Sequence, residues 1–349
     1  MQPDYSRQVL LKGIGAAGQA VLSRSRVLIV GAGGLGSPVL QYLAGAGVGC
    51  LGIVDADTLE PSNLHRQPIY CLADVGRPKV ELARTAVERI NPDVRTETHF
   101  VRLDAGNALA LVRNHDAVVD CSDNFRTKYL INDAAVLAQR PAVFASVYQY
   151  EGQMQVYKPH ADHACLRCLW PDGVADGVVG NCAEAGVLGP VPGAFGALQA
   201  LMTLKILLGL PGQLDGELML LDFNNFSSLK LKAPRRAQCR APACALIRAI
   251  DAEPQDLELA IASLEEAAAR GLTVIDIRSD DEVAAQPSAA RHIAMPVLLH
   301  DPAVLPSGRE ILLVCASGKR SLAAARELRS RGIAVRSLAG GLRSLGAKT

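Results

Sequence analysis

The chain has 349 residues, enough for about two domains at roughly 150 residues each, so it is not a peptide-sized binding module. Lys and Arg number 36 against 35 Asp and Glu, and the net charge of +1 predicts no nucleic-acid-binding surface and no attraction to anionic membranes. Hydrophobic residues make up 49% and aromatic residues 4%, which is typical of a globular α/β protein. No basic region followed by an apolar stretch opens the sequence, so we expect no secretory signal and a cytoplasmic protein.

The first part of the chain alternates apolar runs with segments of helical spacing. Residues 26–31 form an apolar run that ends at glycine, residues 34–47 have helical spacing, and residues 50–55 are apolar again, which predicts a βαβ unit. Further strands alternate with helices, the strands at 96–101, 116–121 and 141–147 and the helices at 78–90, 105–113 and 125–138. This order predicts an α/β fold with a doubly wound, mostly parallel, Rossmann-like sheet.

The pattern changes after residue 151. A strand is predicted at 153–158, and residues 172–189 are rich in glycine and aspartate without clear periodicity. Residues 190–210 are apolar enough to resemble a membrane span, but Lys205 lies within them and prolines and glycines crowd their start, which favours a buried helix. Two more strands are predicted, at 217–222 and 228–232.

A stretch containing proline and arginine divides the chain. It predicts a linker at 240–253, with a first domain at 1–245 and a second at 253–349. In the second domain the pattern predicts a helix at 256–271, strands at 273–278 and 310–315, and a helix at 321–332. The tail is therefore expected to be a small α/β domain.

The loop after the first strand has the sequence GAGGLG (31–36), and Asp55 lies at the end of the next strand. Glycines in this pattern let the backbone approach phosphate at a helix N-terminus, and a carboxylate about 20 residues on can accept hydrogen bonds from ribose hydroxyls. Taken alone, this combination predicts a nucleotide site and fits a nicotinamide or flavin enzyme better than an ATP enzyme.

Cationic and metal-binding side chains near this loop favour a triphosphate. Arg66 and Lys79 can bind phosphate oxygens, Asn63 can add hydrogen bonds, and Asp123 can hold Mg²⁺. The alternative is that Arg66 and Lys79 are solvated surface residues and that Asp123 is the N-cap of the helix that follows it.

Five ordered motifs then resemble one family. They are GAGGLGS (31–37), DADTLEPSNLHRQ (55–67), GRPKV (76–80), DCSDN (120–124) and CAEAGVLGP (182–190). Together they resemble the MoeB/ThiF family of ubiquitin-activating-like sulfur-carrier adenylyltransferases over residues 4–245. Matched motif by motif, the residues implied to contact ATP or its metal are Gly34, Asp55, Ser62, Asn63, Leu64, His65, Arg66, Lys79, Asp123 and Asn124, with Arg7 reaching into the partner subunit's site.

The resemblance implies an activity and partners. The family uses ATP and Mg²⁺ to adenylate the C-terminal glycine of a small ubiquitin-like sulfur-carrier protein (MoaD/ThiS-like) that ends in GlyGly, usually as a homodimer. The carrier could serve molybdopterin, thiamine, cysteine or tRNA thiolation. A terminal carboxylate is already ionised, so its attack on the α-phosphorus needs no general base, and the chain would act by alignment and by placing cations near the departing pyrophosphate.

Nine cysteines in a chain without an export signal favour metal or thiol chemistry over a disulfide framework. Cys165 and Cys168 have the spacing of half a tetrathiolate Zn²⁺ site, and Cys239 and Cys244 could complete it, although four residues separate this second pair where the family has two. Such a site would be structural. The alternative is that all four are free thiols.

Two further cysteines are candidates for sulfur chemistry. Cys182 lies in the irregular stretch where the family places a cysteine that can form a thioester or a mixed disulfide with the carrier. It could equally be an unreactive loop cysteine.

Cys315 ends an apolar strand and opens the loop CASGKRS (315–321) before a helix. Inward amides, the helix N-terminus and the nearby Lys319 and Arg320 would stabilise a thiolate or persulfide anion there. With VIDIRS (274–279), HIAMP (292–296) and LAGGL (338–342), the tail resembles a rhodanese domain over about 253–345, in which Asp276 and Arg278 would be scaffold residues. A structural cysteine at a strand end is the alternative.

The sequence thus predicts a two-step enzyme with catalytic residues Cys315, Cys182, Arg66, Lys79 and Asp123. The first domain would adenylate the carrier, and a Cys315 persulfide, loaded by a cysteine desulfurase or from thiosulfate, would deliver sulfur to the acyl-adenylate or to a Cys182 thioester to give a thiocarboxylate. One alternative is an NAD(P)-dependent oxidoreductase with a redox-sensing tail, and another is a non-catalytic scaffold that binds a ubiquitin-like partner.

Overall fold

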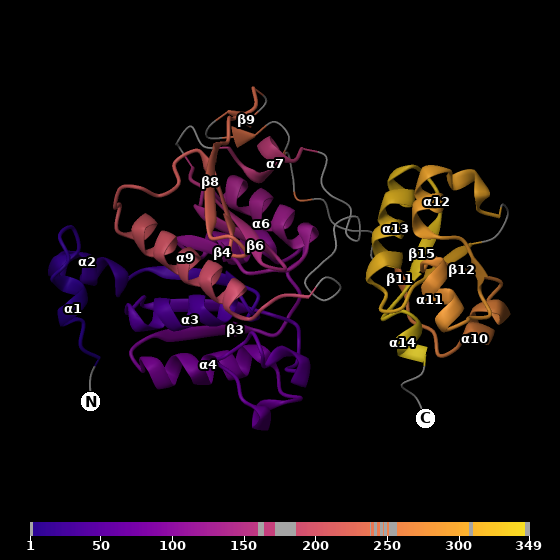
Figure 1. Cartoon of the computed structure of the whole chain (residues 1–349), viewed down its shortest axis with the longest axis horizontal. Coiled ribbons are helices and arrows are strands. Elements are labelled where there is room, and N and C mark those ends of the chain that lie inside the picture. The colour runs from indigo at the N-terminus through magenta and orange to yellow at the C-terminus, as the bar shows by residue number, and fades with distance from the viewer. Residues whose placement is uncertain are drawn as a thin grey trace. The chain divides into compact units, whose positions relative to one another are not determined.

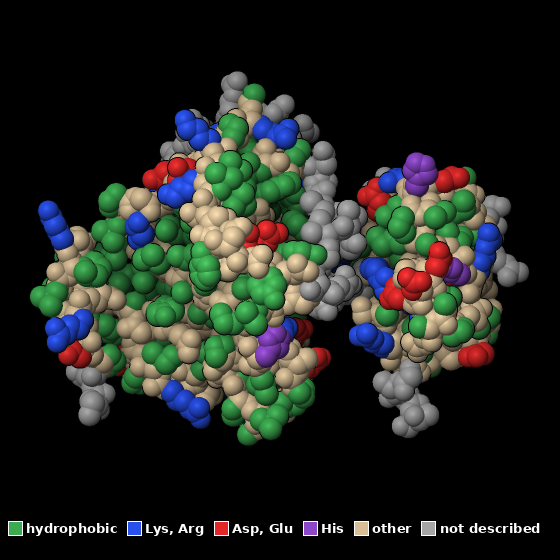
Figure 2. All heavy atoms as spheres, in the orientation of Figure 1, with side chains coloured by type: hydrophobic (Ala, Val, Ile, Leu, Met, Phe, Trp, Pro, Cys, Tyr) green, Lys and Arg blue, Asp and Glu red, His purple; other side chains and the backbone are tan. Residues whose placement is uncertain are grey.

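The computed structural model describes residues 3–159, 164–171, 186–237, 239–240, 243–244, 247, 250, 257–306 and 310–345. The chain divides near residue 252 into two compact units, each with its own sheet (Figure 1). On the face drawn in Figure 2, side chains of both charges are interspersed over each unit, as the near-zero net charge predicts.

An eight-stranded sheet forms the larger unit, in the order β3-β2-β1-β4-β5-β6-β7-β8. Its strands are β1 (Arg26–Val30), β2 (Cys50–Val54), β3 (Arg95–His99), β4 (Ala117–Asp120), β5 (Ala142–Tyr148), β6 (Glu151–Tyr157), β7 (Glu217–Asp222) and β8 (Ser227–Lys232). The pairs from β3 to β5 are parallel, and those from β5 to β8 are antiparallel. The predicted doubly wound sheet is confirmed, with an antiparallel extension at one side.

Helices cover both faces of this sheet (Figure 1). They are α1 (Ser6–Val9), α2 (Gly15–Leu22), α3 (Gly36–Gly45), α4 (Lys79–Ile90), α5 (Ala108–Arg113), α6 (Phe125–Ala138), α7 (Leu166–Leu169) and α9 (Pro190–Leu207), with the 3₁₀ turns η1 (Pro61–Asn63) and η2 (Leu72–Asp74). The α3, α4 and α9 helices share one apolar core with alternate strand residues such as Val27 and Val143. The α5 and α6 helices pack on the other face, against Leu28 and Phe144. The strands and helices predicted for this part begin and end within three residues of those observed.

The apolar helix α9 packs on the sheet and on α3. By length and composition alone it is a candidate membrane span. Its buried face nevertheless carries polar groups with partners in the sheet, because the Gln199 amide donates to the carbonyl of Asp120 at 2.7 Å and lies 3.3 Å from that of Val143. This packing accounts for its apolar composition and agrees with the prediction of a buried helix.

The smaller unit holds a five-stranded parallel sheet in the order β11-β15-β14-β12-β13. Its elements are β11 (Glu258–Leu259), α10 (Leu264–Ala269), β12 (Thr273–Asp276), α11 (Asp280–Ala285), β13 (Arg291–His292), α12 (Met295–His300), η3 (Pro302–Val304), β14 (Ile311–Val314), α13 (Lys319–Ser330), β15 (Val335–Leu338) and α14 (Leu342–Leu345). A buried cluster that includes Ile275, Leu313 and Ala324 forms its core.

The helix predicted at 256–271 is wrong in its first half. Residues Glu258–Leu259 form strand β11 beside β15, and a helix begins only at Leu264. The Ser263 hydroxyl accepts a hydrogen bond from the Glu266 amide at 3.3 Å and so caps a new helix. Pairing with a neighbouring strand outweighs the helical propensity of this short segment.

The contact between α9 and α3 gives a stability prediction. At Gly196 a Cβ atom would lie 2.3 Å from the Leu35 carbonyl oxygen, whereas at Gly193 on the same helix nothing lies within 4 Å. We expect Gly196→Ala to destabilise the larger unit by about 1–3 kcal/mol because the backbone must move. Gly193→Ala, the matched control, should be neutral or stabilising by up to about 1 kcal/mol. Denaturant unfolding of the two variants measures the difference, and equal midpoints would contradict the predicted contact.

Candidate functional site

The glycine loop between β1 and α3 lies at the carboxyl ends of the parallel strands. Gly31 has a φ of +99°, and a Cβ atom there would lie 2.6 Å from the Cys121 carbonyl oxygen. A Cβ atom at Gly36 would lie 2.2 Å from the Gly31 carbonyl oxygen. Only glycine fits at both positions, so the loop packs tightly on the end of β4 and leaves its amides at the start of α3.

Asp55 follows β2 and holds this loop. One carboxylate oxygen accepts the Ala32 amide at 2.8 Å, and the other accepts the Asp57 amide at 2.8 Å. Burial raises the pKa of Asp55, against the opposing effects of Lys79 and of the two amides. Each oxygen retains a lone pair, so the carboxylate can both fix the loop and accept from a ribose hydroxyl.

Lys79, the first residue of α4, is 6% exposed, so the alternative that it is a solvated surface residue is wrong. Its ammonium lies 3.1 Å from a carboxylate oxygen of Asp57, which is itself exposed. The cation is thus held near Asp55 with a partner at the surface. A bound phosphate could take over part of that pairing.

Residues 62–67 form a segment that also lies against the glycine loop. A Cβ atom at Gly34 would lie 3.4 Å from the Arg66 carbonyl oxygen, and one at Gly33 would lie 3.5 Å from the Gln67 side chain. The Arg66 guanidinium reaches back to the Ser62 carbonyl at 2.9 Å and to the ring of His65 at 2.8 Å. Of the other predicted residues here, Asn63 is buried, Ser62 and His65 are exposed, and Leu64 is half-buried.

Asp123 follows β4 and is exposed. The N-cap of α6 is Asn124, whose side-chain oxygen accepts the Thr127 amide at 2.9 Å. The alternative that Asp123 caps this helix is therefore wrong. Asp123 is in the turn whose first residues, Cys121 and Ser122, lie against Gly31 of the glycine loop. Arg7, on α1, is also exposed.

A buried ion pair that no sequence motif marks lies next to the turn that carries Asp123. The Lys128 ammonium donates to the Asp120 carboxylate at 2.7 Å, to the Ser122 carbonyl at 3.0 Å and to the Ala145 carbonyl at 2.6 Å. Both charged side chains are nearly inaccessible to solvent. The pair ties the end of β4 to the middle of β5 and to the turn that carries Asp123. One sequence signal could have found it: Lys128 shares a helix face with Ile131 and Ala135, at core spacing.

Three of the four predicted metal ligands come together beside α7. The sulfurs of Cys165, Cys168 and Cys239 all lie within 4.8 Å of one another, and all three residues are buried. Hydrogen bonding from Cys165 and Cys168 holds the pKa of the Cys239 thiol well below its usual range. Cys244 is also buried and lies directly opposite Cys239 where β9 (Cys239–Arg240) pairs with β10 (Ala243–Cys244). Three sulfurs therefore lie close enough together to bind one metal ion, and Cys244 is the candidate for a fourth ligand.

The cysteine cluster is clamped to helix α6. The Leu166 amide donates to the Asn132 side chain at 2.7 Å, and the Arg167 guanidinium binds the Asp133 carboxylate at 2.8 and 2.6 Å. Arg167 also lies over the Tyr129 ring, 5.0 Å from its centre. Because α6 starts beside Asp123, the same helix supports the nucleotide edge and the cysteine cluster (Figure 1).

Cys182, the other cysteine predicted near this site, lies outside the described residues. Cys315 follows β14 in the smaller unit and is buried. Its sulfur accepts hydrogen bonds from the Ser321 amide at 3.4 Å and the Ser321 hydroxyl at 3.5 Å. Gly318, with a φ of +81°, turns the loop into α13. The Ser321 groups that contact the sulfur are thus in the first turn of a twelve-residue helix, whereas the side chain of Lys319, the other cation predicted here, lies outside the described residues.

The glycines of LAGGL (338–342) close the loop from the other side. The Leu342 amide donates to the Cys315 carbonyl at 2.8 Å, and the Arg343 amide donates to that of Ala316 at 3.1 Å. A Cβ atom at Gly341 would lie 2.2 Å from the Gly318 nitrogen. Only glycine lets the two segments approach so closely.

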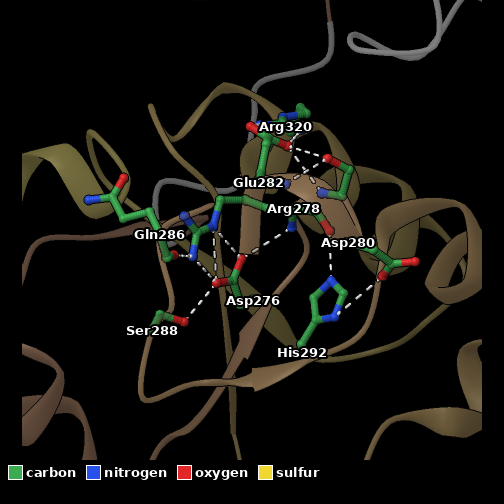
Figure 3. Close-up of polar contacts among 9 residues, drawn as sticks. Asp276, Arg278, Asp280, Glu282, Gln286, Ser288, His292 and Arg320 are labelled. Atoms are coloured by element: carbon green, nitrogen blue, oxygen red, sulfur yellow. Dashed lines mark hydrogen bonds and ion pairs between the residues drawn. The ribbon is translucent and has the colours of Figure 1, made fainter. Parts of the chain in front are cut away.

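Arg320 has a partner other than the sulfur. Its guanidinium binds Glu282 through two hydrogen bonds of 2.6 Å, as Figure 3 shows. These bonds lower the pKa of Glu282 to about 2, so the pair stays charged at neutral pH. The prediction that Arg320 supplies a cation for the sulfur is corrected: the Glu282 carboxylate balances the charge of Arg320. The Arg320–Glu282 pair also ties the cysteine loop to α11.

Asp276 and Arg278 form a second, buried pair below α11 (Figure 3). Arg278 donates to the Asp276 carboxylate at 2.6 Å, and the Ser288 hydroxyl donates to the same group at 2.7 Å. His292 Nε2 lies 2.8 Å from the Arg278 carbonyl oxygen. This network joins β12, α11 and β13, which agrees with the scaffold role predicted for Asp276 and Arg278.

Comparison with known proteins identifies both units. The ThiF family model matches residues 5–241, and the rhodanese-like domain model matches residues 258–348.

The chain is 48% identical over 244 residues to "Sulfur carrier protein adenylyltransferase" of Thermus thermophilus, covering 69% of this chain and 89% of that protein. It is 48% identical over 237 residues to "Adenylyltransferase and sulfurtransferase MOCS3" of Aedes aegypti, covering 67% of this chain and 54% of that protein. The matched region spans about half the length of the MOCS3 relatives.

Solved structures share the fold of the larger unit. E. coli MccB superposes with a TM-score of 0.59 at 22% identity, covering 72% of this chain and 74% of that chain. MccB solved with ATP gives a TM-score of 0.56 at 21% identity, covering 65% and 68%. At this identity the likeness concerns the fold alone.

The Lys128–Asp120 pair gives a second stability prediction. Lys128→Met leaves the buried Asp120 carboxylate without its cation, so we expect the larger unit to lose about 3–5 kcal/mol of stability. Adding Asp120→Asn to that variant removes the buried charge and should recover part of the loss. Denaturant unfolding of the single and double variants tests this, and a single variant as stable as the wild type would refute the buried pairing.

Proposed function

The chain belongs to the ThiF family, and from that premise we propose that its larger unit uses ATP to adenylate the C-terminal glycine of a small ubiquitin-like sulfur-carrier protein ending in GlyGly. The observation that carries this proposal is the convergence of the glycine loop, Asp55, Lys79 and the turn with Asp123 at one edge of the sheet. The family assignment favours this function over the alternatives of an NAD(P)-dependent oxidoreductase and a non-catalytic scaffold.

Each residue of the site has a task in this reaction. The amides of the glycine loop face phosphate oxygens at the start of α3, and Asp55 accepts from the ribose. Lys79 and Arg66 supply the cations that bind the triphosphate. Asn63 and its neighbours Ser62, Leu64 and His65 belong to the same segment as Arg66. Gly34, in the glycine loop, and Asn124, the N-cap of α6, are the other residues that the family resemblance assigns to this site.

A magnesium ion at Asp123 would offset the negative charge of the departing pyrophosphate. The exposed carboxylate fits such an ion, because Mg²⁺ is commonly held by one or two carboxylates together with phosphates and water. Most of the remaining rate acceleration would come from alignment of the carrier carboxylate with the α-phosphorus, since no proton has to be removed. Exposed Arg7 is proposed to complete the partner subunit's site in a homodimer.

We expect Asp123→Ala to reduce carrier-dependent exchange between ATP and pyrophosphate by about 100-fold or more, because the charge on the pyrophosphate loses its counter-charge. Asp93→Ala, at an exposed aspartate after α4, is the matched control and should exchange normally. Near-normal exchange by the Asp123 variant would contradict the metal role.

We propose that the smaller unit carries the sulfur on Cys315. Its thiolate attacks the outer sulfur of thiosulfate, releasing sulfite, or the persulfide of a cysteine desulfurase, releasing that enzyme's thiolate. The terminal sulfur of the Cys315 persulfide then attacks the acyl-adenylate, AMP leaves and an acyl disulfide forms. Attack by a second thiol, for which Cys182 is the candidate, releases the thiocarboxylate and leaves a disulfide that a small thiol reduces. Having both units in one chain raises the effective concentration of the sulfur donor.

Cys315→Ala should preserve ATP/pyrophosphate exchange and abolish thiocarboxylate formation, because only the sulfur-carrying atom is removed. The carrier protein is incubated with the enzyme, MgATP and thiosulfate or a desulfurase, and its mass is then measured. Cys71→Ala, which removes an exposed thiol, is the control and should form thiocarboxylate. Loss of exchange in the Cys315 variant would argue against a division of labour between the two units.

The cysteine cluster is proposed to hold zinc through Cys165, Cys168, Cys239 and Cys244. An all-sulfur site has no open position for substrate, so a bound zinc would be structural. The residues themselves already join α7 to β9 and, through Arg167, to α6.

A further inference from the structure

Two buried serines lie beside the sulfur of Cys315. Ser321 is on α13 and Ser337 is on β15, and both are 0% exposed. Their hydroxyl oxygens are 2.8 Å apart, and that of Ser321 lies 3.5 Å from the Cys315 sulfur. A continuous chain of polar atoms therefore runs from the reactive sulfur through Ser321 to Ser337.

The hydrogen-bond donors and acceptors among these polar atoms can be counted. Each hydroxyl has one hydrogen to donate and lone pairs to accept with. Besides the sulfur and the hydroxyls themselves, the Gly318 carbonyl accepts, 3.1 Å from the Ser321 oxygen and 3.5 Å from that of Ser337. If Ser337 donates to Ser321, the Ser321 hydrogen is free for the sulfur. If Ser321 donates to Ser337 instead, the sulfur loses this donor and Ser337 is left with the longer bond to Gly318.

The charge on the sulfur selects between these arrangements. A thiolate or persulfide anion accepts hydrogen bonds more strongly than an amide carbonyl. A hydroxyl that itself receives a hydrogen bond becomes a better donor, and the effect is larger away from water. Both conditions hold for Ser321 when Cys315 is ionised.

We propose that Ser337 is a positioning residue for Cys315: its hydroxyl donates to Ser321 and so directs the Ser321 hydrogen at the sulfur whenever the sulfur is an anion. This inference rests on the proposed role of Cys315 as the sulfur carrier. When Cys315 is part of the neutral acyl disulfide, its sulfur carries no charge and the hydroxyl pair can turn towards the Gly318 carbonyl. No motif in the sequence marks Ser337.

Charged and titratable groups on the neighbouring elements could also influence the sulfur. They include Asp276 at the end of β12, Arg278 after it, Glu282 on α11, His292 on β13, Arg320 on α13, Arg336 on β15 and Arg343 on α14. Asp276 pairs with Arg278, and Glu282 pairs with Arg320. None of them is altered by substitution of a neutral hydroxyl, so a change in titration can be assigned to the serine pair.

The test uses the full chain with Ser337→Thr and Ser337→Val, which have nearly the same volume and differ in the hydroxyl. The pH titration of Cys315 is followed by the ultraviolet absorbance of its thiolate, taken as the difference from the same chain carrying Cys315→Ala. We expect the midpoint for Ser337→Val to move about 0.3–0.7 units to higher pH relative to Ser337→Thr, because the Ser321 hydroxyl is no longer directed at the thiolate. Ser321→Ala, which removes the direct donor, should move it further in the same direction.

A midpoint that is the same for Ser337→Thr and Ser337→Val, while Ser321→Ala moves it, would overturn the proposal and reduce Ser337 to a packing residue. Thermal unfolding of the two Ser337 variants shows whether the added methyl group disturbs both equally. The titration needs neither carrier nor sulfur donor. A chain that titrates as expected but forms no thiocarboxylate would therefore contradict the proposed function and leave the role of Ser337 intact.

Discussion

The parallel pairing of β1 with both β2 and β4 is the constraint on which the nucleotide site depends. It brings the residues after three strands, far apart in the chain, to one edge of the sheet. The loop after β1 then packs so tightly on the end of β4 that Gly31 cannot carry a side chain. With the backbone held in this way, Asp55 can bind the Ala32 amide and still present its remaining lone pairs outward.

Both units place their proposed functional side chain after a parallel strand and close to a helix N-terminus, but the two side chains differ in exposure. In the larger unit Asp123 is exposed, which suits the proposed binding of a triphosphate and its metal ion. In the smaller unit Cys315 is buried and hydrogen-bonded to Ser321. Enclosure by backbone amides and neutral hydroxyls can stabilise a sulfur anion while limiting its contact with water.

Ion pairs hold both sites in shape. Lys128, on α6, links the end of β4 to the middle of β5, and Arg167 ties the cysteine cluster to the same helix. Glu282 has the corresponding place in the smaller unit, where it binds Arg320 of the cysteine loop. Each of these groups has a charged partner within the protein, and such networks rigidify the elements that they join.

The sequence by itself determined the order of strands and helices in the larger unit, the glycine loop with Asp55, and the pairing of Cys165 with Cys168, because each depends on local spacing or periodicity. The tertiary structure alone decided that residues 258–259 form a strand, since β15 supplies its partner. It also decided the partners of Lys128, Arg320 and Ser337, which are side chains on different elements of the fold. Periodicity can indicate that a residue is buried, but it does not say which side chain it meets, so only the folded chain could reveal these pairs.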